Sequence, residues 1–350
     1  MALTDKIVKI ADKTRKLTGL TTKMTLDEIA SNMDLIKANP ILQDKSIEIT
    51  ENGTQTITAN EGYDGLNSVE VVTNVAGSGG REEPTKGIVI DEFDENGYVT
   101  KMRIVGFEVI PDYYCYDGSP NDTVYDNSNL EIRISEGVTE LGKYSFNGIS
   151  GNILLPNTLK KIREYAFNNS KFASINLSQD ITDIEKYAFY QNSALEITEL
   201  PNSLINLGQS AFEKCSKIEI KKIPDGVTII NQKALSNCDK IVQLSMKNVA
   251  TIIGTSGSLG AFYSNGGMKA VWIGSTITSS GFGRYSFNSC TSLSKIFIDL
   301  PRAQVEAFTY YSTKWSNNTV ASDCQIICND DEGFMTKEQF DSIDWATYTG

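Results

Sequence analysis

The sequence predicts a mainly β protein, a solenoid of short stacked repeats that follows a short helical segment and a small β-unit. Three observations carry this prediction. A small residue followed by an apolar one recurs at intervals of 21 to 27 residues. The stretches between these pairs are short extended runs with period-two alternation. The 350 residues also exceed a typical compact domain, which suits an extended array of repeats.

The amino-acid composition of the chain argues against several classes of function. The chain has 32 Lys and Arg against 44 Asp and Glu, a formal charge of −12, so we expect no nucleic-acid partner. It has no histidine, which excludes histidine-dependent catalytic and metal sites. No apolar run approaches the roughly 20 residues that a membrane helix needs, so we expect no membrane insertion. The first 25 residues lack the continuous apolar core of a signal peptide.

Residues 1–45 predict two short helices. Ile7, Ile10 and Leu17 lie on one helical stripe, and Thr25-x-x-Glu28 is a capping-box pattern. Helices this short are not stable alone, so their apolar stripes must pack against something. A local helical hairpin and a subunit or partner contact both remain open.

Residues 46–75 change to the alternation of a small β-unit, and residues 76–84, which contain Ala76-Gly77-Ser78-Gly79-Gly80, predict a flexible linker. A solenoid with a leading hairpin is expected over 85–328. In the hairpin, Ile88–Asp91 and Tyr98–Val105 flank a turn that ends in Asn96-Gly97. The turn is acidic but lacks the ligand spacing of a calcium loop, which favours a solvated turn.

The repeat is defined by seven pairs of a small and an apolar residue: Ser145-Phe146, Ala166-Phe167, Ala188-Phe189, Ala211-Phe212, Ala234-Leu235, Ala261-Phe262 and Ser286-Phe287. Stacking would bury their apolar members as one ladder. Five residues before each apolar member lies a further apolar residue: Leu141, Ile162, Ile184, Leu207, Ile230 and Phe282. Gly257 departs from this pattern, because a glycine-rich insertion, Ile253–Gly260, interrupts its repeat and is expected to form a surface loop.

Six cysteines are present, at 115, 215, 238, 290, 324 and 328, without a CxxC pair. Cys215, Cys238 and Cys290 share one slot of the repeat, which other copies fill with Ile149, Ser170, Asn192 and Asn265. A slot that accepts these replacements predicts a packing position and free thiols. Stacking would also bring Cys215 and Cys238 within disulfide range, so the bridged alternative stays open.

The pattern Leu-x-x-Ile-x-x-x-Pro, followed by Ile-x-x-x-Ala-Phe-x-x-Cys, resembles the BspA-type leucine-rich repeat. Its best copies are Ile184–Phe212 and Leu207–Cys238, and the resemblance covers residues 105–328. It implies a solenoid whose role is binding rather than catalysis, with no cofactor and no catalytic residue. Members of the family are largely surface and adhesion proteins.

A second resemblance concerns both ends of the chain. Thr4–Leu17, Thr25–Met33 and the strand unit that begins with Gly62-Tyr63-Asp64-Gly65 are similar to the amino-terminal segments of tail proteins of phages that infect Gram-positive bacteria. Residues 299–331 resemble phage-encoded repeat proteins. This implies a virion tail location, a homotrimer, and docking of residues 1–75 on other tail or baseplate proteins. The expected partner is a host cell-surface glycan or protein.

Three groups of aromatic residues are candidates for receptor binding. Alternation places Trp272 and Phe297 outward on adjacent units, and Tyr310, Tyr311 and Trp315 follow. The alternative is that the terminal segment 329–350 folds back over Trp272 and Phe297 as a cap. Within that segment, Thr336-x-x-Gln339 predicts a short helix that covers the edge of the final unit.

The second group is a column two residues before the ladder: Tyr144, Tyr165, Tyr187 and Tyr285. Ordinary packing at a repeat position is the alternative. The third group lies in the insertion 112–126 and contains Tyr113, Tyr114 and Tyr116, where disorder is the alternative.

The functional hypothesis is a non-enzymatic phage tail-tip or fibre protein that binds the host surface through its repeats. A bacterial surface adhesin with the same repeat is the alternative. A tail-associated glycan-degrading enzyme is disfavoured, because such chemistry needs paired carboxylates and the acidic residues here are scattered singly.

Overall fold

The computed structural model describes residues 54–57, 69–73, 86–93, 99–112, 114, 130–254, 259–308 and 320–348. The helices predicted for residues 1–45 and the linker predicted for 76–84 lie outside these ranges. The chain divides into two compact units, residues 1–159 and residues 160–350.

The first unit contains a six-stranded sheet with the order β1-β2-β3-β4-β6-β8. Its strands are β1 (Thr54–Ile57), β2 (Val69–Thr73), β3 (Gly87–Phe93), β4 (Val99–Val105), β6 (Glu131–Ile134) and β8 (Asn152–Leu154). β3 and β4 pair antiparallel, which confirms the predicted hairpin. β2 pairs parallel with β3, so strands on both sides of residues 76–84 belong to one sheet. From β4 onward the pairing is parallel, and β5 (Val109–Ile110) pairs parallel with β7 (Glu140–Leu141).

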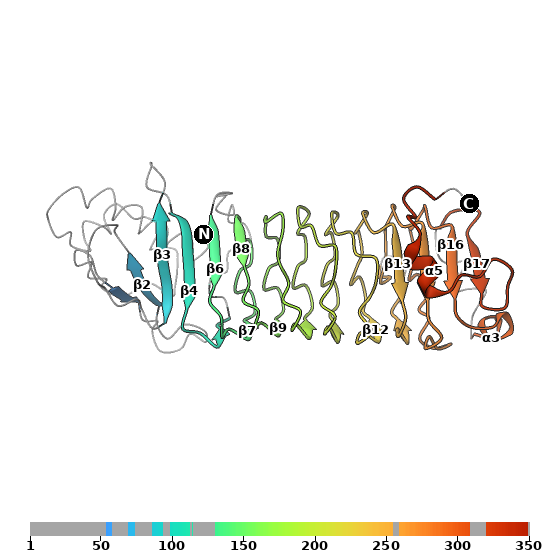
Figure 1. The fold of residues 1–350 in the computed structure, drawn as a ribbon, viewed down its shortest axis with the longest axis horizontal. Helices are drawn as coiled ribbons and strands as arrows, with labels where there is room; N and C mark the ends of the chain where they lie inside the picture. The colour runs from blue at the N-terminus through green and yellow to red at the C-terminus, as the bar shows by residue number, and fades with distance from the viewer. Residues whose placement is uncertain are drawn as a thin grey trace. The chain divides into compact units, whose positions relative to one another are not determined.

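The second unit is a stack of repeats whose short strands pair in parallel. One side carries β9 (Lys161–Ile162), β10 (Asp183–Ile184), β11 (Asn206–Leu207), β12 (Ile229–Ile230) and β14 (Thr251–Ile252). A four-stranded parallel sheet follows, with β13 (Gln243–Met246), β15 (Ala270–Ile273), β16 (Lys295–Ile298) and β17 (Gln325–Cys328) (Figure 1). The second unit contains two short helices among its described residues, α3 (Arg302–Glu306) and α5 (Lys337–Ser342). The predicted fold class, a mainly β repeat solenoid, is confirmed.

The apolar ladder forms the centre of the second unit. The ring centroids of Phe167 and Phe189 are 5.2 Å apart, those of Phe189 and Phe212 are 5.0 Å apart, and those of Phe262 and Phe287 are 5.1 Å apart. Leu235 occupies the ladder position between the two runs of rings, and it is fully buried like them. Each repeat therefore advances by about one ring-stacking distance.

One repeat takes its strand residue from farther back in the sequence, as expected where Gly257 departs from the pattern. Ile252 fills the strand position there, pairing with Ile230 in β12 and bridging to Phe282. Thr251 and Ile252 are β-branched and suit a strand, whereas the residues that follow are rich in glycine. The insertion therefore lies between the strand and the turn of this repeat. For this reason the strand residue Ile252 is ten residues before Phe262 in the sequence, rather than five as in the other copies.

The cysteine slot is a hydrogen-bond donor position. The thiols of Cys215, Cys238 and Cys290 donate to the carbonyl oxygens of the ladder residues Phe189, Phe212 and Phe262, at 3.0, 3.2 and 3.0 Å. In other repeats the side-chain amide does the same: Asn192 donates to Phe167 and Asn265 to Leu235, each at 2.8 Å. In the five repeats from Asn192 to Cys290 the slot thus holds a short donor, because a buried carbonyl without a partner costs free energy.

The predicted free thiols are confirmed for the five cysteines that the structure describes. Burial raises the pKa of the Cys215 and Cys290 thiols to about 12 and that of Cys238 well above its usual range. Such thiols stay protonated at neutral pH, which keeps them available as donors and makes them poor nucleophiles.

Candidate functional site

The repeats of the second unit leave their short strands through tight turns, and most of these turns contain two left-handed residues. The first turn position has φ between 53° and 59° in Tyr165, Tyr187, Ser210, Lys233 and Tyr285. The fifth position has φ between 52° and 66° in Asn169, Gln191, Lys214, Asn237, Ser264 and Ser289. A non-glycine residue in this region costs roughly 1–2 kcal/mol, so the surrounding structure must hold it there.

Hydrogen bonds between neighbouring turns hold this conformation. The N–H groups of Tyr187, Phe189 and Gln191 donate to carbonyl oxygens of the next repeat at 2.9, 2.8 and 2.9 Å. The same alternate positions donate in the repeats before and after, always towards the following repeat. We call the side chains at the first, fourth and fifth turn positions between Tyr165 and Ser289 the turn face.

Three tyrosines form a cluster on the turn face. The rings of Tyr165 and Tyr187 stack at 4.7 Å with an angle of 4° between their planes. Tyr190, at the fourth position of its turn, meets Tyr187 edge to face at 5.6 Å. All three are half-buried, so part of each ring lies in contact with solvent. This tyrosine cluster is the largest aromatic group on the turn face.

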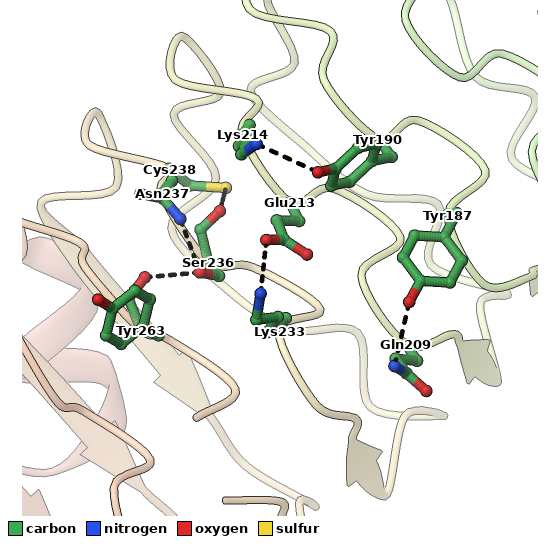
Figure 2. A network of polar contacts seen from close by, with 10 residues as sticks. All are labelled: Tyr187, Tyr190, Gln209, Glu213, Lys214, Lys233, Ser236, Asn237, Cys238 and Tyr263. Carbon is green, nitrogen blue, oxygen red and sulfur yellow. Dashed lines mark hydrogen bonds and ion pairs between the residues drawn. The ribbon is translucent and has the colours of Figure 1, made fainter. Parts of the chain in front are cut away.

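Polar side chains adjoin the tyrosine cluster (Figure 2). The Gln209 amide donates to the Tyr187 hydroxyl at 3.3 Å, and the Lys214 ammonium donates to the Tyr190 hydroxyl at 3.1 Å. The Lys214 nitrogen is also 5.2 Å from the centre of the Tyr190 ring. Beside them, the carboxylate of Glu213, whose side chain is only 6% exposed, accepts from Lys233 at 2.9 Å.

The charges of this region are unevenly matched. The carboxylates of Glu164, Glu185 and Glu213 each pair with a lysine of a neighbouring repeat at 2.9 Å; these lysines are Lys186, Lys161 and Lys233. Lys214 is exposed, and its contacts are with the hydroxyl and ring of Tyr190 rather than with a carboxylate. The tyrosine cluster is therefore bordered by a cation that has no acidic partner among the described residues.

The next repeats contribute a network that stiffens the backbone. The Ser236 hydroxyl donates to the Tyr263 carbonyl at 2.7 Å and accepts from the Asn237 side chain at 2.9 Å (Figure 2). Ser236 and Asn237 hold the fourth and fifth turn positions that Tyr190 and Gln191 hold two repeats earlier. The same backbone positions thus carry aromatic side chains in one repeat and small polar ones in another.

The structure divides the predicted tyrosine column. Tyr165 and Tyr187 stack together, whereas Tyr285 lies farther along the stack, beyond Ser210, Lys233 and Gly260. Tyr144 is half-buried in the first unit, where Lys143 lies 5.5 Å from its ring centre. Sequence reasoning missed Tyr190, because it followed one position of the repeat only. The spacing of three residues after a left-handed tyrosine was the available signal.

The candidate assignment of Trp272 and Phe297 as a receptor surface is corrected. They occupy the outward slot as predicted, since Ser245, Trp272 and Phe297 pair in register. However, Trp272 is 4% exposed and Phe297 is fully buried. The carboxyl-terminal segment covers both through Phe340 and Trp345, and the Trp272 indole donates to the Met335 carbonyl at 3.0 Å. Burial of these large apolar rings favours the cap alternative.

The capping box at Thr336 and Gln339 forms, and α5 follows it. The position predicted for this helix is wrong, because α5 packs over the outward face of the sheet that contains β13, β15 and β16 rather than over the edge of the last unit (Figure 1). Phe340 and Trp345 anchor it there beside Phe297, with ring centroids 5.8 and 5.9 Å from that ring.

One member of the third candidate group, Tyr114, is also corrected. Tyr114 is fully buried, and its ring meets that of Phe107 edge to face at 5.1 Å, so it serves the core of the first unit. Tyr113, Tyr116, Tyr310, Tyr311 and Trp315 lie outside the described residues.

The helices in the described part of the chain are not long and apolar enough to cross a membrane. Within residues 54–348, where the structure describes them, no three His, Cys, Asp or Glu side chains gather in a way that suits a metal ion.

The repeat identified from the sequence matches a known family. The profile of the BspA type leucine rich repeat region matches residues 120–242 and 217–337. The chain belongs to this leucine-rich repeat family. No curated protein sequence matches it.

Several solved structures of leucine-rich repeat proteins are similar to this chain. A leucine-rich repeat protein from Bacteroides ovatus is 18% identical, and the match covers 80% of this chain and 90% of that protein with a TM-score of 0.36. A leucine-rich repeat protein from Eubacterium ventriosum is also 18% identical, and the match covers 57% of this chain and 68% of that protein with a TM-score of 0.33. A leucine-rich cell surface protein from Faecalibacterium prausnitzii is 13% identical, with 76% and 98% covered and a TM-score of 0.27.

Proposed function

We propose that this leucine-rich repeat protein is a non-enzymatic binding protein that attaches to a cell surface through its turn face. The observation that carries the proposal is the tyrosine cluster of Tyr165, Tyr187 and Tyr190 with Lys214 at its border. Half-buried tyrosines with polar ends are typical of recognition surfaces, because they offer apolar area at low entropic cost. A stack of repeats suits binding, since it presents such side chains along an extended face.

Replacing the cluster tests the proposal. The variant Tyr165→Ser, Tyr187→Ser, Tyr190→Ser copies residues that the same slots already hold, because Ser210 and Ser236 occupy them in later repeats. We therefore expect it to fold, and to bind a panel of Gram-positive cells about tenfold more weakly than the unchanged chain. Fluorescence of labelled protein on washed cells measures this. Ile205→Ser, at a side chain 62% exposed and outside the turn face, is the matched control. A triple variant that binds like the control contradicts the proposal.

The setting that we propose is a phage tail. The resemblance of residues 4–33 and 62–71 to tail proteins supports this, and residues 1–75 would then join the chain to other tail or baseplate proteins and into a homotrimer. Light scattering of the full chain should give a molar mass three times that of one 38.5 kDa chain.

Antibodies raised against residues 160–350 test the location, and they should label the tails of purified particles. Label on the bacterial envelope instead would favour the second candidate, a surface adhesin, which the family resemblance supports.

A further inference from the structure

We propose that the turn face binds a linear carbohydrate that carries negative charge and lies across several repeats. This inference rests on the proposed function and names the ligand class of the same site. It combines the chemistry of the tyrosine cluster, the charge at its border and the spacing of the repeats.

The aromatic part favours a sugar over a purely apolar partner. Each phenol of Tyr187 and Tyr190 already accepts a hydrogen bond from a neighbouring side chain, so its ring is held in place before any ligand arrives. Tyr187 stacks on Tyr165 of the preceding repeat. In the following repeat the equivalent position is Ser210, so that repeat offers the amide of Gln209 rather than another stacked ring. A ring beside amide and ammonium donors matches a sugar, which combines apolar C–H faces with hydroxyl groups.

The charge favours an anionic sugar. Glu164, Glu185 and Glu213 are each neutralised by a lysine, as described above, so they present little net negative charge. Lys214 stands exposed beside Tyr190 and retains donors for a ligand, because an ammonium group carries three. The chain as a whole is strongly acidic and would repel an anionic ligand at most places. At the tyrosine cluster the Lys214 ammonium opposes this repulsion, and it can bind a carboxylate or phosphate group.

The spacing favours a linear polymer. Successive turns present equivalent positions about one ring-stacking distance apart, as the separations of 5.0 to 5.2 Å between ladder rings show. From Tyr165 to Lys233 the first turn position passes through four consecutive repeats. An extended chain of regular units would meet several of these repeats at once, and its weak contacts would add to a useful affinity.

An oligosaccharide array tests the inference with the full chain. The array carries linear oligosaccharides of two to eight sugars, each in a neutral, a carboxylate-bearing and a phosphate-bearing form. We expect binding to charged members of six or more sugars, with the carboxylate and phosphate arms distinguishing the source of the charge. Lys214→Gln, which copies Gln191 in the same slot, should weaken that binding about tenfold. Ile205→Ser should leave it unchanged.

Failure of this inference is distinguishable from failure of the proposed function. Equal binding of neutral and charged members, or of pairs and hexamers, overturns the anionic or the linear part. No binding to any member overturns the carbohydrate class, while the loss of cell binding by the triple tyrosine variant would still support the turn face. If the triple variant keeps both activities, the proposed function and this inference fail together.

Discussion

Replacement of Phe297 by alanine is expected to lower the free energy of unfolding by about 3–5 kcal/mol, because it opens a cavity under the carboxyl-terminal cap. The Phe297 ring is fully buried among Phe340, Trp345 and Phe334, with centroids 5.8, 5.9 and 6.5 Å away. Denaturant titration followed by tryptophan fluorescence measures the loss, since Trp272 and Trp345 report on the cap itself.

Trp345→Ala removes the opposite side of the same contact and should cost a similar amount. Ile205→Ser should change stability by less than about 0.5 kcal/mol, because the side chain is largely exposed. A Phe297→Ala protein that keeps its stability and loses cell binding would contradict the cap and restore the outward aromatics as a receptor surface.

Replacement of Phe189 by alanine is the second change with a large expected effect, again about 3–5 kcal/mol. Its ring lies between those of Phe167 and Phe212, so alanine would interrupt the stack on both sides. Chemical unfolding followed by circular dichroism measures the change. Phe189→Leu is the matched control, because Leu235 fills the same ladder position naturally.

For that control we expect a loss below about 1.5 kcal/mol. Equal losses for alanine and leucine would mean that ring stacking, rather than filled volume, stabilises the ladder. Losses below 1 kcal/mol for both would mean that neighbouring repeats close over the missing ring, contrary to the close packing described here.

The ladder could be predicted from the sequence because its period is carried by buried side chains, and buried apolar residues tolerate few alternatives. The donor role of the Cys215 slot could not, because a hydrogen bond to a backbone carbonyl is satisfied by Asn192, Cys215 or Asn265 alike, and these share no obvious side-chain class. What these residues share is the backbone carbonyl of a ladder residue that accepts their hydrogen bond, and this acceptor is visible only in the structure.

The candidate site was predicted in part. Alternation correctly placed Trp272 and Phe297 outward, but it says nothing of what covers a face, and the covering segment comes from residues 334–348. Tyr165 and Tyr187 were singled out by their shared position, whereas Tyr190 joins them only because the left-handed turn brings the fourth position beside the first. That geometry is a property of the turn backbone and is not encoded by side-chain periodicity.

The turn hydrogen bonds also give the stack a direction. The alternate turn N–H groups that bond between repeats, such as those of Tyr187, Phe189 and Gln191, all donate towards the following repeat. The two ends of this row of turns are therefore chemically different, because one offers carbonyl acceptors and the other offers amide donors. Two copies would match end to end only head to tail, which is a heterologous contact that repeats without closing and leads to filaments. A closed ring of three subunits must therefore be made by a different surface from the ends of this ladder.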